Sequence, residues 1–170
     1  AEAEADVIYQ IGALKAFCDA AGVPLHHVKP HGALYNMAVK DPELAAAICR
    51  AVKAAAPEAM LLALSGSEMI KAAQALGLRV CSEVFADRGY QPDGTLVPRG
   101  KPGAMIENEE EAIARVLRMA KQGTVCAVDG STVALQADSV CVHGDGPKAL
   151  AFVRKISAAL PAAGVEIKAQ

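Results

Sequence analysis

The sequence has 170 residues, of which 53% are hydrophobic and 21% are charged. This composition excludes a disordered chain and suits one domain with a sizeable core. The formal net charge of −2 excludes a general affinity for nucleic acid or for an anionic membrane surface. No apolar run reaches the roughly 18 residues that a membrane span needs.

The first half of the chain alternates helical patterns with short apolar runs. The expected elements are a helix over 5–20, a strand over 25–29, a helical turn over 32–38, a helix that begins after Asp41, a strand over 59–64, a helix that ends at Gly77 and a strand over 79–85. Val7, Ile11, Leu14 and Cys18 share one face of the first helix. This succession predicts an α/β protein with a parallel sheet and right-handed crossovers.

Regularity stops between Asp87 and Ala104, where three prolines and four glycines occur. A loop of more than about 15 residues in a compact domain is usually functional or disordered, and stiff prolines favour an ordered lid. Pro92-Asp93-Gly94 predicts a turn at the tip of a small hairpin. The elements expected after the loop are a helix from Asn108 to Gly123, a hairpin with a type I′ turn at Asp129-Gly130, a strand over 139–143 and a helix from Pro147 that buries Leu150, Val153, Ile156 and Leu160.

Five cysteines lie in apolar surroundings without a C-x-x-C pair: Cys18, Cys49, Cys81, Cys126 and Cys141. An odd number without metal or redox spacing indicates reduced core residues of a cytoplasmic protein. A catalytic thiol among them stays open as the alternative.

Two apolar strands end in the same dipeptide, His31-Gly32 and His143-Gly144. Polar side chains at the C-terminal ends of parallel strands face one cleft, where neutral imidazole binds a metal or moves protons near pH 7. Asp145 follows closely enough to orient His143 or to add a carboxylate. The alternative for each histidine is a hydrogen-bonded structural role at a strand end.

Charged residues near these strand ends are further candidates. Glu83 lies inside an apolar strand, so an inward orientation would perturb its pKa. Lys29 and Arg88 are placed to bind an anionic group, with Arg99 and Lys101 as additional cations of the loop. The alternatives are that Glu83 points outward at the edge of the sheet and that Lys29, Arg99 and Lys101 are solvated charges. The sequence contains no P-loop, dinucleotide fingerprint, G-x-S-x-G or H-E-x-x-H motif.

Four blocks of sequence resemble the LamB/YcsF family and are spread over the whole chain. They are Tyr9–Leu14 (YQIGAL), His27–Asn36 (HVKPHGALYN), Glu83–Arg88 (EVFADR) and Cys141–Asp145 (CVHGD). The resemblance implies a seven-stranded, distorted (β/α) barrel of the glycoside hydrolase/deacetylase type. Residues 1–170 would form a single domain, a partial (β/α) barrel with parallel strands that makes up its C-terminal two-thirds.

The resemblance also implies an activity, that of an ATP-dependent 5-oxoprolinase. This enzyme opens 5-oxo-L-proline to L-glutamate with ATP as co-substrate, in assembly with the 5-oxoprolinase B and C subunits. A divalent metal ion and a homo-oligomer stay open. The expected catalytic residues are His31, His143, Asp145, Glu83 and Asp87, and the expected substrate-binding residues are Lys29, Asn36 and Arg88.

The sequence also departs from the family. Members open with an Asp-Leu-Asn-Cys-Asp-Leu-Gly-Glu-like strand, then a Cys-Gly-Phe-His strand and a Gly-Ala-His-Pro strand, which are missing here. A full barrel needs about 250 residues, so we expect about 80 residues to be lacking at the N-terminus. The sheet before residue 25 would then end in an open apolar edge, through which the chain either self-associates or keeps a partly ordered remnant of the lost segment.

Two further functions stay open beside this one. The first is a metal-dependent deacetylase of the same barrel superfamily, which would need a divalent ion between histidines and an aspartate. The second is a non-catalytic scaffold that organises partner enzymes, although a scaffold has no need of two His-Gly strand ends.

Overall fold

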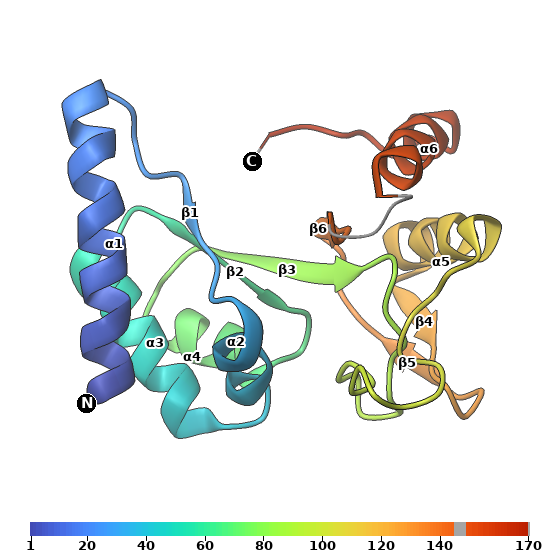
Figure 1. The fold of residues 1–170 in the computed structure, drawn as a ribbon, viewed down its shortest axis with the longest axis horizontal. Helices are drawn as coiled ribbons and strands as arrows, with labels where there is room; N and C mark the ends of the chain where they lie inside the picture. Colours follow the sequence, from blue (N-terminus) through green and yellow to red (C-terminus); the bar gives the residue numbers. More distant parts are fainter. Residues whose placement is uncertain (145–148, 170) are drawn as a thin grey trace. The chain divides into compact units, whose positions relative to one another are not determined.

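The chain folds as six helices and six strands in the computed structural model, which describes residues 1–144 and 149–169 (Figure 1). The helices are α1 (Glu2–Ala21), α2 (Gly32–Ala38), α3 (Pro42–Ala55), α4 (Glu68–Ala75), α5 (Glu109–Gln122) and α6 (Ala149–Ala162). The strands are β1 (His27–Val28), β2 (Met60–Leu64), β3 (Val80–Phe85), β4 (Thr124–Cys126), β5 (Thr132–Ala134) and β6 (Ser139–Cys141). The chain divides into two compact units, Ala1–Ser82 and Glu83–Gln170.

Four of the strands form one sheet in the order β1-β2-β3-β6, with parallel pairing of β1 to β2 and of β3 to β6. Strand β3 contributes residues to both units. Parallel strands joined by helices confirm the predicted α/β class, and they fit part of a (β/α) barrel. No helix among the described residues is both long enough and apolar enough to cross a membrane.

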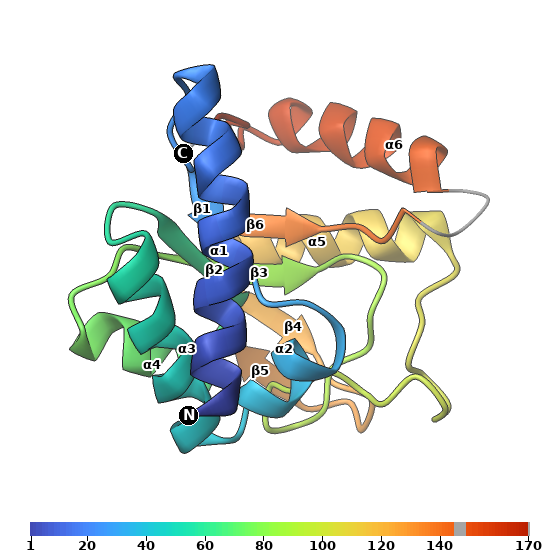
Figure 2. The same cartoon turned by 60° about the vertical axis from the view of Figure 1, so that its left-hand side comes forward.

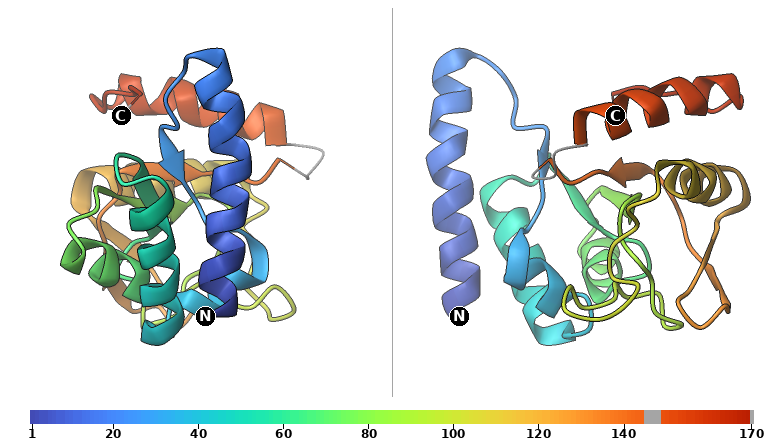
Figure 3. Two further views of the ribbon diagram at one scale, coloured as in Figure 1. Left: turned by 90° about the vertical axis from the view of Figure 1, so that its left-hand side faces the viewer. Right: turned by 45° about the vertical axis from the view of Figure 1, so that its right-hand side comes forward.

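In the first unit, α3 lies alongside the N-terminal half of α1 (Figure 3, left). Arg50 of α3 forms an ion pair with Glu4 of α1, with 2.8 Å between Nη2 and Oε2. Val7 and Ile11 of α1 are buried, as predicted, but Leu14 is 55% exposed. The prediction for Leu14 was wrong because helical periodicity identifies a face of a helix but not how far along it the neighbouring helix reaches.

In the second unit, β3 and β6 pair with Glu83 opposite Ser139 and Phe85 opposite Cys141 (Figure 2). Helix α5 begins where predicted, because Asn108 Oδ1 accepts the Glu111 N–H at 2.9 Å. It ends at Gly123, whose φ of 62° is left-handed.

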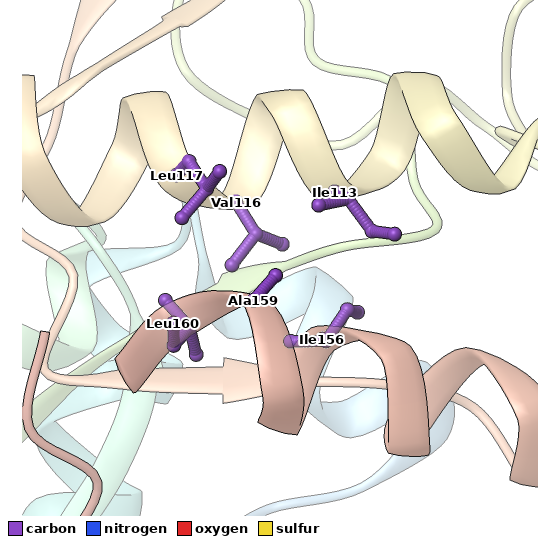
Figure 4. A pocket seen from close by; sticks show the side chains of 6 residues that line it. All are labelled: Ile113, Val116, Leu117, Ile156, Ala159 and Leu160. Carbon is purple, nitrogen blue, oxygen red and sulfur yellow. The ribbon is translucent and has the colours of Figure 1, made fainter. Parts of the chain in front are cut away.

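Helix α6 packs against α5 through an apolar seam (Figure 4). The seam is lined by Ile113, Val116, Leu117, Ile156, Ala159 and Leu160. Ile156 and Leu160 are buried as predicted, whereas Leu150 and Val153 are exposed and Phe152 is buried instead. Residues 152, 156 and 160 are four apart, so they lie on one side of the helix. The predicted start at Pro147 lies outside the described residues.

Strands β4 and β5 form the predicted antiparallel hairpin, with Val125 opposite Val133. Its turn is not type I′, which needs a positive φ at both central residues. Gly130 has a φ of +87°, but no residue other than glycine has a positive φ among those described. Asp129 Oδ1 instead accepts the N–H and the hydroxyl of Ser131, at 2.9 and 2.6 Å. The turn is therefore longer than the sequence pattern suggested.

Candidate functional site

An aspartate and a histidine meet where β3 and β6 end. Asp87 Oδ2 lies 2.7 Å from His143 Nδ1 and 3.4 Å from the His143 backbone nitrogen. The two strands are parallel and adjacent, so their C-terminal ends lie at the same edge of the sheet. The Ala86 N–H donates to the Cys141 carbonyl at 3.1 Å, which continues the ladder to the residue before Asp87.

The chemistry of the two groups fixes how they interact. An ionised carboxylate only accepts hydrogen bonds, so the tautomer that fits this contact carries its proton on His143 Nδ1 and donates a hydrogen bond to Asp87 Oδ2. Nε2 is then left to accept or release a proton at a reacting group, which is how an orienting carboxylate serves a general acid–base histidine. Both side chains are only partly exposed, at 21% for His143 and 12% for Asp87.

The second carboxylate oxygen of Asp87 is buried and has no hydrogen-bond partner among the described residues. An unsatisfied buried acceptor costs about 1–3 kcal/mol, so such atoms usually mark a functional site or an ordered water. The ring of Phe85 stacks on the imidazole of His143 with a centroid distance of 5.7 Å and an interplanar angle of 24°. The imidazole is thus bound at Nδ1 by a carboxylate and covered on one face by an aromatic ring.

Glu83 lies in β3 opposite Ser139 and is only 2% exposed. The sequence predicted an inward orientation for Glu83 because its neighbours in the strand are apolar, and such an orientation requires the burial that is observed. Alternate side chains of a strand point to the same face, so Glu83 and Phe85 share one face of β3. The catalytic role of Glu83 stays a prediction.

Arg88, only 5% exposed, binds the backbone of the loop that it begins. Its Nε donates to the Ala104 carbonyl at 3.1 Å and its Nη2 to the Val97 carbonyl at 2.6 Å. Burial and the charge of Arg99 lower its pKa, against the opposing effect of Asp87. Because these two donors are bound to loop carbonyls, the observed role of Arg88 is to close the loop. Substrate binding by Arg88 stays a prediction.

The loop 87–104 is ordered, as its prolines predicted. Tyr90 and Leu96 form an antiparallel bridge, and the Gln91 N–H donates to the Thr95 carbonyl at 2.7 Å. This confirms the small hairpin around Pro92-Asp93-Gly94. At the base of the loop the chain passes so closely that a Cβ at residue 89 would lie 1.9 Å from the Gly103 carbonyl oxygen.

Three of the other predicted residues, His31, Asn36 and Lys29, belong to the first unit. His31 is the exposed N-cap residue of α2, and the φ of +61° at Gly32 is one that glycine adopts readily. Asn36 Nδ2 donates to the Gly32 carbonyl at 3.0 Å within the same helix. Lys29 Nζ lies 5.6 Å from the centroid of the Tyr35 ring. A cleft shared by His31 and His143 stays a prediction, and Asp145 lies outside the described residues.

Sequence reasoning missed two aromatic residues at the site, Phe85 and Tyr90. The Tyr90 hydroxyl accepts the Phe85 N–H at 2.8 Å, and both side chains are buried. The chain has only six Phe and Tyr residues, so two of them within three residues of Asp87 is a signal that the sequence offers. Among the described residues, no group of three or more His, Cys, Asp or Glu side chains is arranged to hold a metal ion.

A parallel α/β sheet that carries an Asp–His pair at its strand ends has the arrangement in which (β/α) barrel enzymes place their active sites. The model of the LamB/YcsF family matches residues 1–170. The chain belongs to the LamB/YcsF family.

Curated relatives and a solved structure agree with this assignment. The chain is 57% identical over 166 residues to the 5-oxoprolinase A subunit of Clostridium beijerinckii, covering 98% of this chain and 65% of the relative. It is 56% identical over 163 residues to the Tolumonas auensis protein of the same name, with 96% and 65% covered. The crystal structure of a lactam utilization protein from Thermus thermophilus superposes with a TM-score of 0.89 at 50% identity, covering 99% of this chain and 67% of that one. The chain thus spans about two thirds of the length of these relatives.

Proposed function

We propose that this chain forms part of the A subunit of an ATP-dependent 5-oxoprolinase, which opens 5-oxo-L-proline to L-glutamate. The observation that carries the proposal is the Asp87–His143 pair in a chain that shares more than half of its residues with proteins named as the A subunit of 5-oxoprolinase. The similar protein from Thermus thermophilus is named for lactam utilization, which points to the same chemical class of substrate.

A lactam is a poor electrophile because its nitrogen donates electrons into the carbonyl group. Phosphorylation of the carbonyl oxygen by ATP would remove that resonance and supply a leaving group. One water then forms a bond to the activated carbon, and the ring C–N bond breaks as the nitrogen takes a proton. A second water hydrolyses the resulting acyl phosphate, which gives the carboxylate of glutamate and releases phosphate.

In this scheme His143 moves the proton. Its Nε2 accepts a proton from the attacking water and returns it to the ring nitrogen, while Asp87 keeps Nδ1 protonated and stabilises the transient imidazolium. Glu83 and His31 remain further candidates for stabilising charge, and Lys29 for the carboxylate of the substrate. Asn36 is a proposed substrate ligand on the family resemblance alone.

The relatives are named as one lettered subunit of an enzyme, which implies that they work with other subunits. We assign the phosphorylation step to a partner, the B or the C subunit, because this sequence contains no phosphate-binding loop motif.

The test is glutamate release from 5-oxo-L-proline and ATP by a full-length A subunit that contains this chain, combined with the B and C subunits. The expected result is ATP-dependent release that Asp87→Asn and His143→Ala each lower by roughly 10² or more. His26→Ala is the matched control, since His26 is exposed and lies just before β1 rather than after a strand, with its Nδ1 3.2 Å from His27 Nδ1. Equal activity of all three variants, or acetate release from N-acetylated sugars without glutamate release, would overturn the proposal.

A further inference from the structure

Tyr90 is the largest of the fully buried side chains among the described residues and is only 1% exposed. It belongs to the loop 87–104, yet its hydroxyl reaches back to the last residue of β3, where it accepts the Phe85 N–H at 2.8 Å. A buried backbone N–H needs a partner, and here a side chain from the loop supplies it.

The residue that Tyr90 holds is in contact with His143. The ring of Phe85 stacks on the imidazole, with 5.7 Å between their centroids. Asp87, which binds the imidazole at Nδ1, lies only two residues beyond Phe85. A shift of the end of β3 would therefore move the stacking ring and the carboxylate together.

Tyr90 itself is fixed from several directions. Its carbonyl accepts the Val128 N–H at 2.9 Å, which ties it to the segment after β4. The preceding residue, Gly89, is bonded on both sides, because its N–H donates to the Ala104 carbonyl at 3.0 Å and its carbonyl accepts the Val97 N–H at 2.9 Å. Burial raises the pKa of the Tyr90 hydroxyl, so its oxygen stays a neutral acceptor over the physiological range.

We propose that Tyr90 is a positioning residue for His143, acting through the hydroxyl bond to Phe85 that fixes the end of β3. The effect of Tyr90 on catalysis rests on the proposed function, whereas its effect on the position of His143 does not. The alternative is that Tyr90 only fills the core. The two differ in what the hydroxyl does, since Tyr90→Phe keeps the ring and removes only the acceptor.

The experiment compares Tyr90→Phe with Tyr9→Phe, a matched control because Tyr9 is the most exposed large apolar residue of α1. The first readout is the pair of imidazole nitrogen-15 shifts of His143 in the free chain, which report how completely Nδ1 carries the proton. The second is kcat and KM for glutamate release with the B and C subunits. For Tyr90→Phe we expect a mixture of His143 tautomers and a roughly 10-fold or greater loss of kcat at unchanged KM, because small displacements of a reacting group are costly.

Phe85→Leu is the second variant, because it removes the ring through which Tyr90 acts while keeping the residue apolar. It should show the same mixture of tautomers. A single Nδ1-protonated tautomer in folded Tyr90→Phe, or in Phe85→Leu if Tyr90→Phe does not fold, would overturn the inference even if kcat falls. If the wild-type assembly releases no glutamate, the proposed function fails, whereas the nitrogen shifts still decide the role of Tyr90.

Discussion

Replacing Gly89 with alanine tests the tightest packing point of the loop 87–104. The added Cβ would lie 1.9 Å from the Gly103 carbonyl oxygen, 3.1 Å from its carbonyl carbon and 3.3 Å from Val97 Cγ2. The nearest atom belongs to the backbone and has no rotamer with which to move away. Gly89 is not among the glycines with positive φ, so the variant measures the collision alone rather than backbone strain.

The size of the effect follows from what must move. The backbones at 89 and 103 have to separate by more than about 1 Å to reach an ordinary contact, and overpacking of this kind costs about 1–3 kcal/mol. The same movement stretches the two hydrogen bonds of Gly89, each worth about 1 kcal/mol. We expect the free energy of unfolding to fall by about 2–4 kcal/mol, and the melting temperature by roughly 5–15 °C for a chain of this size.

Urea and thermal unfolding followed by circular dichroism would measure this difference. Gly100→Ala is the control, because Gly100 lies in the same loop, is not among the glycines with positive φ and has no atom within 4 Å of an added Cβ. If Gly89→Ala is as stable as Gly100→Ala, the close approach at the base of the loop is not a constraint and the reasoning fails.

Three further outcomes are expected. His143→Ala and His31→Ala should each lower turnover in the glutamate assay by roughly 10² or more; normal activity of both would show that the histidines are structural. Arg88→Lys should lower the free energy of unfolding, measured in urea, by about 1–3 kcal/mol, because an ammonium group cannot reproduce the two hydrogen bonds that the guanidinium donates to loop carbonyls. Equal midpoints of urea unfolding for Arg88→Lys and Arg99→Lys would contradict this. Burial raises the pKa of Cys49 to about 11, so the unfolded thiol ionises near pH 9 while the folded one stays neutral. Stability should therefore fall between pH 9 and 11, and less so in Cys49→Ala; an equal fall in both proteins would refute the assignment.

The sequence predicted the strands that carry Asp87 and His143 but not that these two residues meet. Asp145 stays a prediction as a residue that orients His143 or adds a carboxylate, since it lies outside the described residues. The observed partner of His143 is Asp87, which is 56 residues away. That contact depends on β3 lying beside β6 with Phe85 opposite Cys141. Hydrophobic patterning indicates the strands but not which of them are neighbours.

The exposure of apolar helix residues and the burial of Arg88 were predicted less well, because both depend on contacts made in the tertiary structure. Leu150 has the spacing of a core residue but is exposed, because an apolar-rich helix offers more than one apolar stripe. Leu14 lies on the same stripe as the buried Val7 and Ile11 and is nevertheless exposed, since periodicity does not say how far along the helix its neighbour reaches. The sequence indicates Arg88 as a ligand of an anionic group, yet its side chain is buried and binds carbonyls that face it only once the loop has folded. Such partners come from tertiary structure and leave no local pattern in the sequence.

The pairing of β3 with β6 also has a consequence for how the protein folds. Closing a loop of more than 50 residues costs about 3–4 kcal/mol of chain entropy before any contact repays it, and the Asp87–His143 contact spans 56 residues. The intervening chain contains the hairpin β4–β5 and helix α5, which form through local contacts and shorten the distance still to be closed. The pair should therefore assemble late in folding. A nascent chain that has not yet emerged beyond residue 138 would hold the complete loop 87–104 and still lack the histidine that this loop serves.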